Sequence, residues 1–212
     1  TVNRTDCGFR LGKPYAVRAF AGLFKPKWKI WGNEFAGVAE EVGDDVTEFN
    51  LGDAVFGIDQ KNWGAHAEYK CMPADGAITL KPINLSFEQS VALLEGPWLA
   101  MNYLSKIPLG PQYTMLINGA SGSISSSGIQ LARHFSVHIT AVTDTRHLSL
   151  AKTLGADTVI DYSQQDFTAL DQQFDYVFDA VGKSSFSPGR KILKPNGIYF
   201  STDFGNHYEN AY

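Results

Sequence analysis

The chain has 212 residues, of which 44% are hydrophobic, so it can bury one large core or two modest ones. Its formal net charge of −4, without a long Lys/Arg run, argues against a nucleic-acid partner, because phosphate contacts need clustered positive charge. No apolar run approaches the length of a membrane span. Two cysteines, Cys7 and Cys71, are too few for a disulfide framework or a four-cysteine zinc lobe. These features predict a protein of the reducing cytoplasm with neither nucleic acid nor membrane as a partner.

Short β-like runs separated by turns rich in glycine characterise the first 85 residues, and they predict an irregular β-barrel or sandwich. The runs cover residues 35–42, 53–57, 65–71 and 77–80. The opening residues 1–6 resemble the end of a strand already under way, and the sequence stops soon after a strand near residue 201. We therefore expect both ends of a longer protein to lie outside this sequence.

A helical tract follows and is predicted to link two domains. Ser86-Phe-Glu-Gln89 is a capping box that opens a helix through Leu94. Pro97 is expected to interrupt this helix, after which Trp98, Met101 and Leu104 continue a second helical face.

The stretch 115–131 reads as a strand, a tight turn and a helix. Met115 to Ile117 form an apolar run, and small or apolar residues then recur at helical spacing from Ile124. The first N–H groups of such a helix point at the turn, where a phosphate is the natural ligand. Gly119 and Gly122 suit a dinucleotide-binding turn, whereas a simple turn without a ligand is the alternative.

Further strands alternate with helices in the second half of the chain. Strands are predicted at 137–142, 158–160 and 174–179, and a last one at 198–201 after a turn at 194–197. A helix is predicted at 145–154, between the first two of these. Such alternation with short connections is typical of an α/β fold with a doubly wound parallel sheet.

Seven motifs in a fixed order make the chain similar to the medium-chain dehydrogenase/reductase superfamily. Six of them run from Gly32-Asn-Glu-Phe-Ala-Gly-Val38 to Gly119-Ala-Ser-Gly-Ser123, and the seventh, Asn3-Arg-Thr-Asp6, resembles the zinc-independent quinone oxidoreductase, or ζ-crystallin-like, branch. The resemblance implies a GroES-like β-barrel catalytic domain at 1–92 and a Rossmann domain at 93–212, both partial. It also implies that NAD(P)H and substrate meet between them.

The resemblance bears on zinc and on catalysis. In the zinc alcohol dehydrogenases the positions that resemble Asn3 and Asn33 carry a cysteine and a histidine, the ligands that zinc prefers. With asparagine at both, we expect no metal, and hydride delivery to a quinone or an α,β-unsaturated carbonyl. Asn3 is the first candidate to stabilise charge on the substrate oxygen, Asn33 is the second, and Asp6 is an orienting group. Capping of turns is the alternative role for all three.

For the cofactor, the resemblance places Thr143 at the adenosine ribose, with Asp144 one step beyond. A hydroxyl tolerates a 2′-phosphate and Arg146 can pair with it, so NADPH is favoured, although NADH returns if Asp144 points inward. The residues expected to bind the cofactor are Ser121, Gly122, Ser123, Ile124, Thr143, Arg146, Tyr162, Val181, Gly182 and Ser201.

Two departures from the family pattern stand in the cofactor region. Ser125 adds a side chain where the family has glycine, which is expected to push the helix outward or misplace the pyrophosphate, and Leu99 replaces a threonine. The alternatives to an NADPH-dependent reductase of a small quinone or enone are therefore a nucleotide-binding relative without turnover and a zinc-free alcohol or aldehyde oxidoreductase. A homodimer is an open alternative to a monomer.

Overall fold

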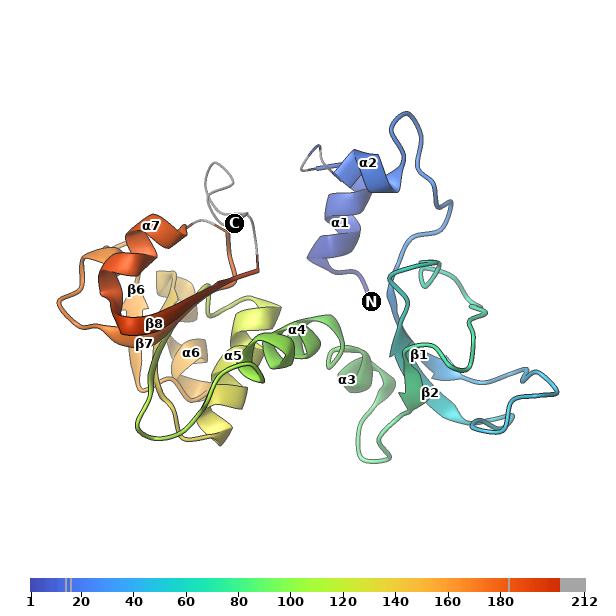
Figure 1. The fold of residues 1–212 in the computed structure, drawn as a ribbon. Coiled ribbons are helices and arrows are strands. Elements are labelled where there is room, and N and C mark those ends of the chain that lie inside the picture. Colours follow the sequence, from blue (N-terminus) through green and yellow to red (C-terminus); the bar gives the residue numbers. More distant parts are fainter. Residues whose placement is uncertain (14, 16, 183, 203–212) are drawn as a thin grey trace. The chain divides into compact units, whose positions relative to one another are not determined.

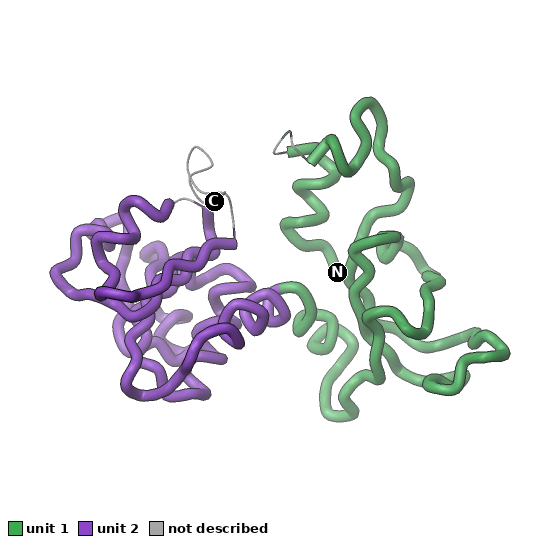
Figure 2. The backbone as a smooth tube through the Cα atoms, in the orientation of Figure 1, with its two compact units in different colours: residues 1–95 green, residues 96–212 purple. Residues whose placement is uncertain are grey.

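The computed structural model describes residues 1–13, 15, 17–182 and 184–202. It divides into two compact units, Thr1–Glu95 and Gly96–Tyr212, which we call unit 1 and unit 2 (Figure 2). The division falls at the start of helix α4, Glu95–Leu104. The domain boundary predicted after residue 92 lies in the short segment that precedes this helix, and it stays a prediction.

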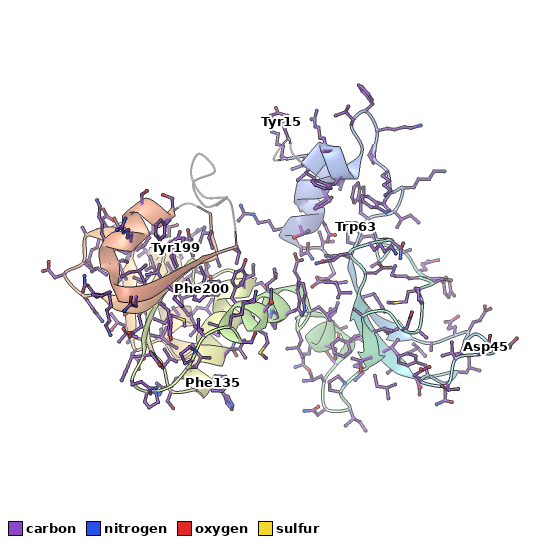
Figure 3. All side chains as sticks on the ribbon, in the orientation of Figure 1. Tyr15, Asp45, Trp63, Phe135, Tyr199 and Phe200 are labelled. Carbon is purple, nitrogen blue, oxygen red and sulfur yellow. The ribbon has the colours of Figure 1, made fainter. Side chains whose placement is uncertain are left out.

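Unit 1 combines an antiparallel sheet with three short helices (Figure 1). The described strands pair in the order β1-β2-β3, with Ala36 of β1 opposite Phe56 of β2. The elements are α1 (Arg4–Leu11), α2 (Val17–Ala21), β1 (Glu34–Val38), β2 (Ala54–Ile58), β3 (Ile78–Leu80) and α3 (Phe87–Val91). Trp63, labelled in Figure 3, is 3% exposed, and its ring lies 4.8 Å from Phe9 and 5.1 Å from Trp31. An aromatic group thus supplies much of this unit's apolar core.

The predicted opening strand at residues 1–6 is wrong, because this segment begins helix α1. Asn3 is the N-cap residue: its side-chain oxygen accepts the backbone N–H of Asp6, and the Asp6 carboxylate accepts the backbone N–H of Asn3, both at 2.9 Å. These reciprocal bonds satisfy two N–H groups that have no intrahelical acceptor. A capping box with Asn and Asp in the usual Ser and Glu positions therefore carries the helical signal.

The predicted strand at 65–71 is also wrong, because the described residues there form bends and irregular structure. The Lys70 ammonium, 9% exposed, lies 2.8 Å from the Asp59 carboxylate and also donates to the Trp63 carbonyl. Trp63 itself has a positive φ of 60°. The backbone of this loop is therefore held by a buried ion pair and not by hydrogen bonds of a β-sheet.

The helical tract at 86–104 differs from prediction in its second half. Ser86 and Gln89 form the predicted capping box, and α3 ends at Val91. Pro97 lies in the first turn of α4, where a missing N–H costs no hydrogen bond, so it does not interrupt the helix. The buried face of α4 consists of Gly96, Ala100 and Leu104, whereas the predicted face residues Trp98 and Met101 are each 52% exposed.

The described strands of unit 2 form a parallel sheet of five, with the strand order β6-β5-β4-β7-β8, as the predicted doubly wound fold requires. The strands are β4 (Thr114–Asn118), β5 (His138–Thr143), β6 (Thr158–Asp161), β7 (Phe174–Asp179) and β8 (Leu193–Ser201). The helices that follow α4 are α5 (Ser123–His134), α6 (Leu148–Thr153) and α7 (Phe186–Gly189), with 3₁₀ turns at Thr145–His147, Phe167–Ala169 and Arg190–Ile192.

Apolar residues on both faces of β4 account for its central position. Met115 and Ile117 face one buried cluster and Leu116 faces the other, and all three are 0% exposed. A strand buried on both sides reads as a continuous apolar run, which is the pattern that predicted this strand. The C-terminal ends of parallel strands lie at the same edge of a sheet, so β4, β5 and β7 end close together.

The last strand is longer than predicted. Lys194–Gly197 was expected to be a turn before a strand at 198–201, but β8 begins at Leu193 and contains these residues. Its pairing with β7 shifts register between Phe174 and Tyr176, and Asn196 has a φ of 66°. The sequence signal for a turn therefore marks a bulge within a strand.

Candidate functional site

The turn between β4 and α5 is held tightly at the edge of the sheet. Gly119 has a φ of 84°, and a Cβ added there would lie 1.9 Å from the Val181 side chain, so only glycine fits. The N–H groups of Gly119 and Ala120 both donate to the Val142 carbonyl at 2.9 Å. These bonds tie the turn to β5, while Val181 lies against it beyond the end of β7.

The start of α5 presents backbone donors that its N-cap does not use. Gly122 is the N-cap, and no side-chain cap hydrogen bond is formed. The first helical bond shown at this end is from Ser126 N–H to the Gly122 carbonyl, at 2.9 Å, so the amides of Ser123, Ile124 and Ser125 precede it. Ser121, Gly122 and Ser123 are exposed. A glycine cap on a 12-residue helix is well suited to an anion such as a pyrophosphate.

Ser125 is accommodated inside the fold by a hydrogen bond. Its side chain is 0% exposed, and its hydroxyl donates to the Asn118 carbonyl at 3.0 Å. Close contact between α5 and the sheet is made by Gly128, where an added Cβ would lie 3.1 Å from the Phe178 ring. Gly96 gives a second close contact, since its Cβ would lie 2.0 Å from the Ser123 hydroxyl. The sequence predicted that Ser125 would push α5 outward or misplace the pyrophosphate. Its side chain is buried and hydrogen-bonded within the fold, and its effect on a pyrophosphate stays a prediction.

At the end of β5, Thr143, which the resemblance placed at the adenosine ribose, is buried, whereas Arg146 is exposed. Thr143 is 1% exposed, and its hydroxyl has no hydrogen-bond partner among the described residues. Asp144 instead accepts from Arg146 Nη2 at 2.7 Å and lies 2.5 Å from His147 Nδ1. The hydrogen bond from Arg146, followed by that from His147, holds the pKa of Asp144 below its usual value. The ribose end therefore carries a paired carboxylate beside an Arg146 side chain that is 82% exposed.

Tyr162 belongs to the same region. Its backbone N–H donates to the Thr143 carbonyl at 3.0 Å, and its side chain is largely exposed. Tyr162 adds to the electrostatic environment that raises the pKa of Arg146, of which Asp144 is the main cause. Arg146 and Tyr162, which were both predicted to bind the cofactor, thus follow the ends of neighbouring strands, and their contacts with a cofactor stay a prediction.

Asp179 organises the ends of three strands and was missed from the sequence. This carboxylate is 0% exposed and accepts from the Asn118 side chain at 3.0 Å, from the Tyr199 hydroxyl at 3.0 Å and from the Val181 N–H at 3.2 Å. Gly182 follows with a φ of 67°. The sequence signal that could have identified Asp179 is an aspartate at the end of a buried strand, three residues before Gly182.

Ser201, the last predicted cofactor contact, ends β8 opposite Asp179. Its carbonyl accepts the Tyr103 hydroxyl at 3.0 Å, and Tyr103 also packs against Phe178 and Phe200. The residue thus lies on the predicted edge, with its backbone carbonyl bound to α4.

The three predicted catalytic residues belong to a polar cluster in unit 1. The Asn3 side-chain amide donates to Asn33 Oδ1 and to Glu34 Oε2, both at 3.0 Å. Both of its N–H groups are therefore engaged within the protein. Asn33 is 0% exposed, and its own amide nitrogen has no hydrogen-bond partner among the described residues. Asp6 is 3% exposed and lies 3.5 Å from His66 Nε2.

Two glutamates in this cluster, the buried Glu34 and the half-buried Glu95, were not anticipated. Glu34 accepts the backbone N–H of Glu95 at 2.7 Å, and Glu95 accepts the Thr5 hydroxyl. Burial raises the pKa of the Glu95 carboxyl, and the charges of Glu34 and Asp6 raise it further, whereas the hydrogen bond from Thr5 and the nearby Asn33 amide lower it. Glu34 and Glu95 stand far apart in the sequence, so no local motif joins them.

The described residues contain neither a metal-ligand grouping nor a membrane-spanning helix. These residues contain no group of three or more His, Cys, Asp or Glu side chains arranged to hold a metal ion. Cys7 and Cys71 are exposed free thiols. Across the described chain, no helix has the length and apolar character needed to cross a bilayer.

Two family models match the chain, one in each unit. The alcohol dehydrogenase GroES-like domain matches residues 1–82, and the zinc-binding dehydrogenase domain matches residues 123–208. The chain belongs to the medium-chain dehydrogenase/reductase superfamily. This membership agrees with the GroES-like and Rossmann domains that the resemblance implied, and with the strand order of unit 2.

Relatives of the chain include proteins named as reductases and oxidoreductases. The chain is 34% identical over 205 residues to a 2-methylene-furan-3-one reductase of Solanum lycopersicum, covering 92% of this chain and 50% of the relative. It is 29% identical to a chloroplastic NADPH-dependent alkenal/one oxidoreductase of Arabidopsis thaliana, with 92% and 51% covered. The quinone oxidoreductase of Coxiella burnetii has a similar structure, with a TM-score of 0.81 and 28% identity over 95% of this chain and 63% of that one. The chain thus spans about half the length of these two curated relatives.

Proposed function

We propose that the protein is an NADPH-dependent reductase that delivers hydride to a quinone or an α,β-unsaturated carbonyl without a catalytic zinc ion. The observation that carries the proposal is the glycine-capped start of α5 at the edge of the parallel sheet. The relatives named as enone, alkenal and quinone reductases support the substrate class.

The geometry of unit 2 fits a dinucleotide. Ser121, Gly122, Ser123 and Ile124 would hold the pyrophosphate, because a glycine cap leaves the first amides of α5 to an anion. Val181, Gly182 and Ser201 border the same edge. The bound cofactor supplies hydride, while these residues fix its position.

NADPH is favoured over NADH by the groups that the structure exposes near the end of β5. Arg146 is the group that would pair with a 2′-phosphate, with Tyr162 nearby. The Asp144 carboxylate would oppose the phosphate, but its charge is offset by Arg146 and His147. Thr143 is buried at the end of β5, so the exposed Arg146 and not Thr143 is the group available to the phosphate.

The zinc-free chemistry rests on the donors in unit 1. Asn3 and Asn33 offer neutral amides at the positions that resemble the cysteine and histidine of the zinc alcohol dehydrogenases, and they are hydrogen-bonded to each other. Since the amide hydrogens of Asn3 are engaged, we assign Asn3 and Asp6 a positioning role, in which they hold Asn33 and Glu34 in place.

A titration with NADPH followed by a small quinone or enone tests the proposal. We expect saturable NADPH binding and then substrate-dependent loss of NADPH absorbance that chelators do not inhibit. Binding without NADPH consumption would favour the nucleotide-binding relative without turnover. Oxidation of a simple alcohol at a comparable rate would favour the zinc-free alcohol or aldehyde oxidoreductase.

The compartment and the assembly stay predictions. Two relatives are named as chloroplastic, so the predicted cytoplasmic location needs its own test by fractionation. Sedimentation of the purified protein would distinguish a homodimer from a monomer.

A further inference from the structure

The positive charge of the chain is concentrated at its start. Residues 1–31 hold seven of the 18 Lys and Arg residues but one of the 22 Asp and Glu residues, which gives this segment a net charge of +6. The remaining residues therefore carry −10, although the net charge of the whole chain is −4. A negatively charged surface attracts the first part of the chain and repels the rest, so residues 1–31 would face such a surface.

These seven cations are not neutralised by carboxylates of the fold. Among the described residues, no Asp or Glu forms an ion pair with any of them. Arg18 donates from Nε to the Gly12 carbonyl at 3.3 Å, and its guanidinium lies 5.0 Å from the centre of the Tyr15 ring. The Lys27 ammonium lies 5.0 Å from the Trp28 ring. Contacts with carbonyls and rings do not cancel a full charge, so the positive field of the segment extends into solvent.

Large apolar side chains are exposed in the same segment. Phe24 is 95% and Phe20 is 73% exposed, and Leu11 and Leu23 are exposed as well. They belong to α1, to α2 and to the loop that follows α2, which together form one end of unit 1, away from β2 (Figure 1). We call the described residues between 4 and 30 the basic lobe. An exposed apolar group of this kind marks an interaction surface.

Basic and apolar side chains share one hollow in the basic lobe. Its lining includes Arg10, Arg18 and Lys25 together with Leu23 and Phe24. Cations beside exposed hydrocarbon are the complement of an amphiphile, in which an anionic head group adjoins an acyl chain. A nucleic acid or a soluble anion would pair with the cations but would leave the aliphatic side chain in water. The combination therefore favours lipid over either of them.

We propose that the basic lobe binds the surface of an anionic lipid bilayer. Lipid phosphates contact Arg10, Arg18 and Lys25, while Phe20 and Phe24 enter the boundary between the head groups and the acyl chains. The sequence predicted no membrane partner because it lacks a spanning run, and a peripheral contact needs none. The inference goes beyond the proposed function and does not rest on it, since neither NADPH nor a substrate enters the argument.

Co-sedimentation of the intact protein with lipid vesicles tests the proposal. We expect binding to phosphatidylcholine vesicles that contain phosphatidylserine, at least about tenfold tighter than binding to vesicles of phosphatidylcholine alone. Binding should weaken as the salt concentration rises, because salt screens the attraction between exposed charges. Equal binding to the two kinds of vesicle, or binding to neither, overturns the proposal.

The contribution of charge is tested by the double variant Lys25→Gln with Lys27→Gln. Its affinity for phosphatidylserine vesicles should fall on the order of tenfold or more. The matched control is Lys61→Gln with Lys191→Gln, because it makes the same change of net charge at exposed lysines outside the basic lobe. The control should bind as the wild type does. Equal losses in the two double variants would show that net charge, and not the basic lobe, governs binding, and would overturn the proposal.

The contribution of the apolar side chains is tested by Phe24→Ser. Since Phe24 is almost fully exposed, the change leaves the fold intact, and it keeps the test decisive if the lysine variants do not fold. We expect about tenfold weaker binding to phosphatidylserine vesicles, because the ring no longer enters the bilayer. Ile83→Ser is the control, since Ile83 is 100% exposed in the same unit but outside the basic lobe. Wild-type affinity in Phe24→Ser contradicts the proposal.

Other occupants of the basic lobe give different results. Glycerophosphoserine carries the lipid head group without acyl chains, and we expect that it does not displace the protein from vesicles. Displacement would identify a soluble-anion site and overturn the proposal, as would binding to a short DNA duplex as tight as binding to vesicles. A dimer in lipid-free solution that Phe24→Ser dissociates would show that a second copy covers the basic lobe, and the bilayer proposal would fail.

Discussion

The two units bury different kinds of side chain, and this difference explains how each holds its shape. Unit 2 is organised around apolar strands, with Met115, Leu116 and Ile117 fully buried. Unit 1 has a smaller apolar core and buries more charged groups, among them the Lys70–Asp59 pair, Asp6 and Glu34, whereas Asp179 is the one buried carboxylate among the described residues of unit 2. Unit 2 should therefore respond most to changes of volume, and unit 1 to changes of charge and pH.

The largest expected effect comes from a cavity in unit 2. Phe178 is 0% exposed and packs against Tyr103, Phe200 and the site of Gly128. Phe178→Ala should lower the free energy of unfolding by about 4 kcal/mol, through lost burial and the cavity that remains. Denaturant titration measures this loss. In the control Phe135→Ala, where Phe135 is 47% exposed, the loss should be below about 1 kcal/mol. Equal losses in the two variants would show that unit 2 does not depend on tight packing.

The difference between the two units also explains which parts of the fold could be predicted from the sequence. The strands of unit 2 were predicted because a strand buried on both faces leaves a continuous apolar run, as in β4 and β7. The errors fall where a side chain far along the chain sets the backbone. The loop at 65–71 is held by the ion pair between Lys70 and Asp59. Glu95 lies beside Glu34, far away in the sequence, because its backbone N–H donates to the Glu34 carboxylate. Periodicity carries no information on such contacts.

Removal of a buried charge is the matching test for unit 1. Lys70→Met leaves the Asp59 carboxylate, 7% exposed, without its cation, and should lower the free energy of unfolding by about 3 kcal/mol. Lys61→Met is the control, because Lys61 is exposed. The double variant Asp59→Asn with Lys70→Met should recover part of the loss. A single variant as stable as the wild type would rule out the ion pair as the determinant of this loop.

The pH dependence of this pair has a definite sign. Burial opposes ionisation of Asp59, but hydrogen bonds from Lys70 and Asn62 outweigh it and lower the pKa below the ordinary value of 3.8. A lowered folded pKa means that the contribution is complete above the unfolded pKa and is lost as pH falls through the folded value. Stability of the wild type should therefore fall more steeply below pH about 4 than that of Lys70→Met.

A smaller and more selective effect is expected at the end of β5. Arg146→Ala should weaken NADPH binding by about tenfold or more, because the 2′-phosphate loses its cation, and should leave NADH binding nearly unchanged. Fluorescence titration with both cofactors measures the ratio. Arg133→Ala is the control, since Arg133 is a surface arginine of the same unit that pairs with Asp157. An equal loss for both cofactors would assign Arg146 a role in folding and not in selectivity.

The smallest effect tests whether unit 2 tolerates a buried polar group where the family pattern has glycine. Ser125 donates to the Asn118 carbonyl at the point where β4 ends, and both partners are buried. Ser125→Ala should lower the free energy of unfolding by about 1 kcal/mol, because the hydrogen bond is lost while the methyl group still fills the site. Ser125→Gly should cost more, since a glycine in a helix interior adds about 1 kcal/mol relative to alanine. Neither change should tighten NADPH binding, because Gly128 and Gly96 already make the close contacts of α5. If Ser125→Gly binds NADPH more tightly than the wild type, then the serine displaces the pyrophosphate after all, and the start of α5 is a weaker anion site than its uncapped amides indicate.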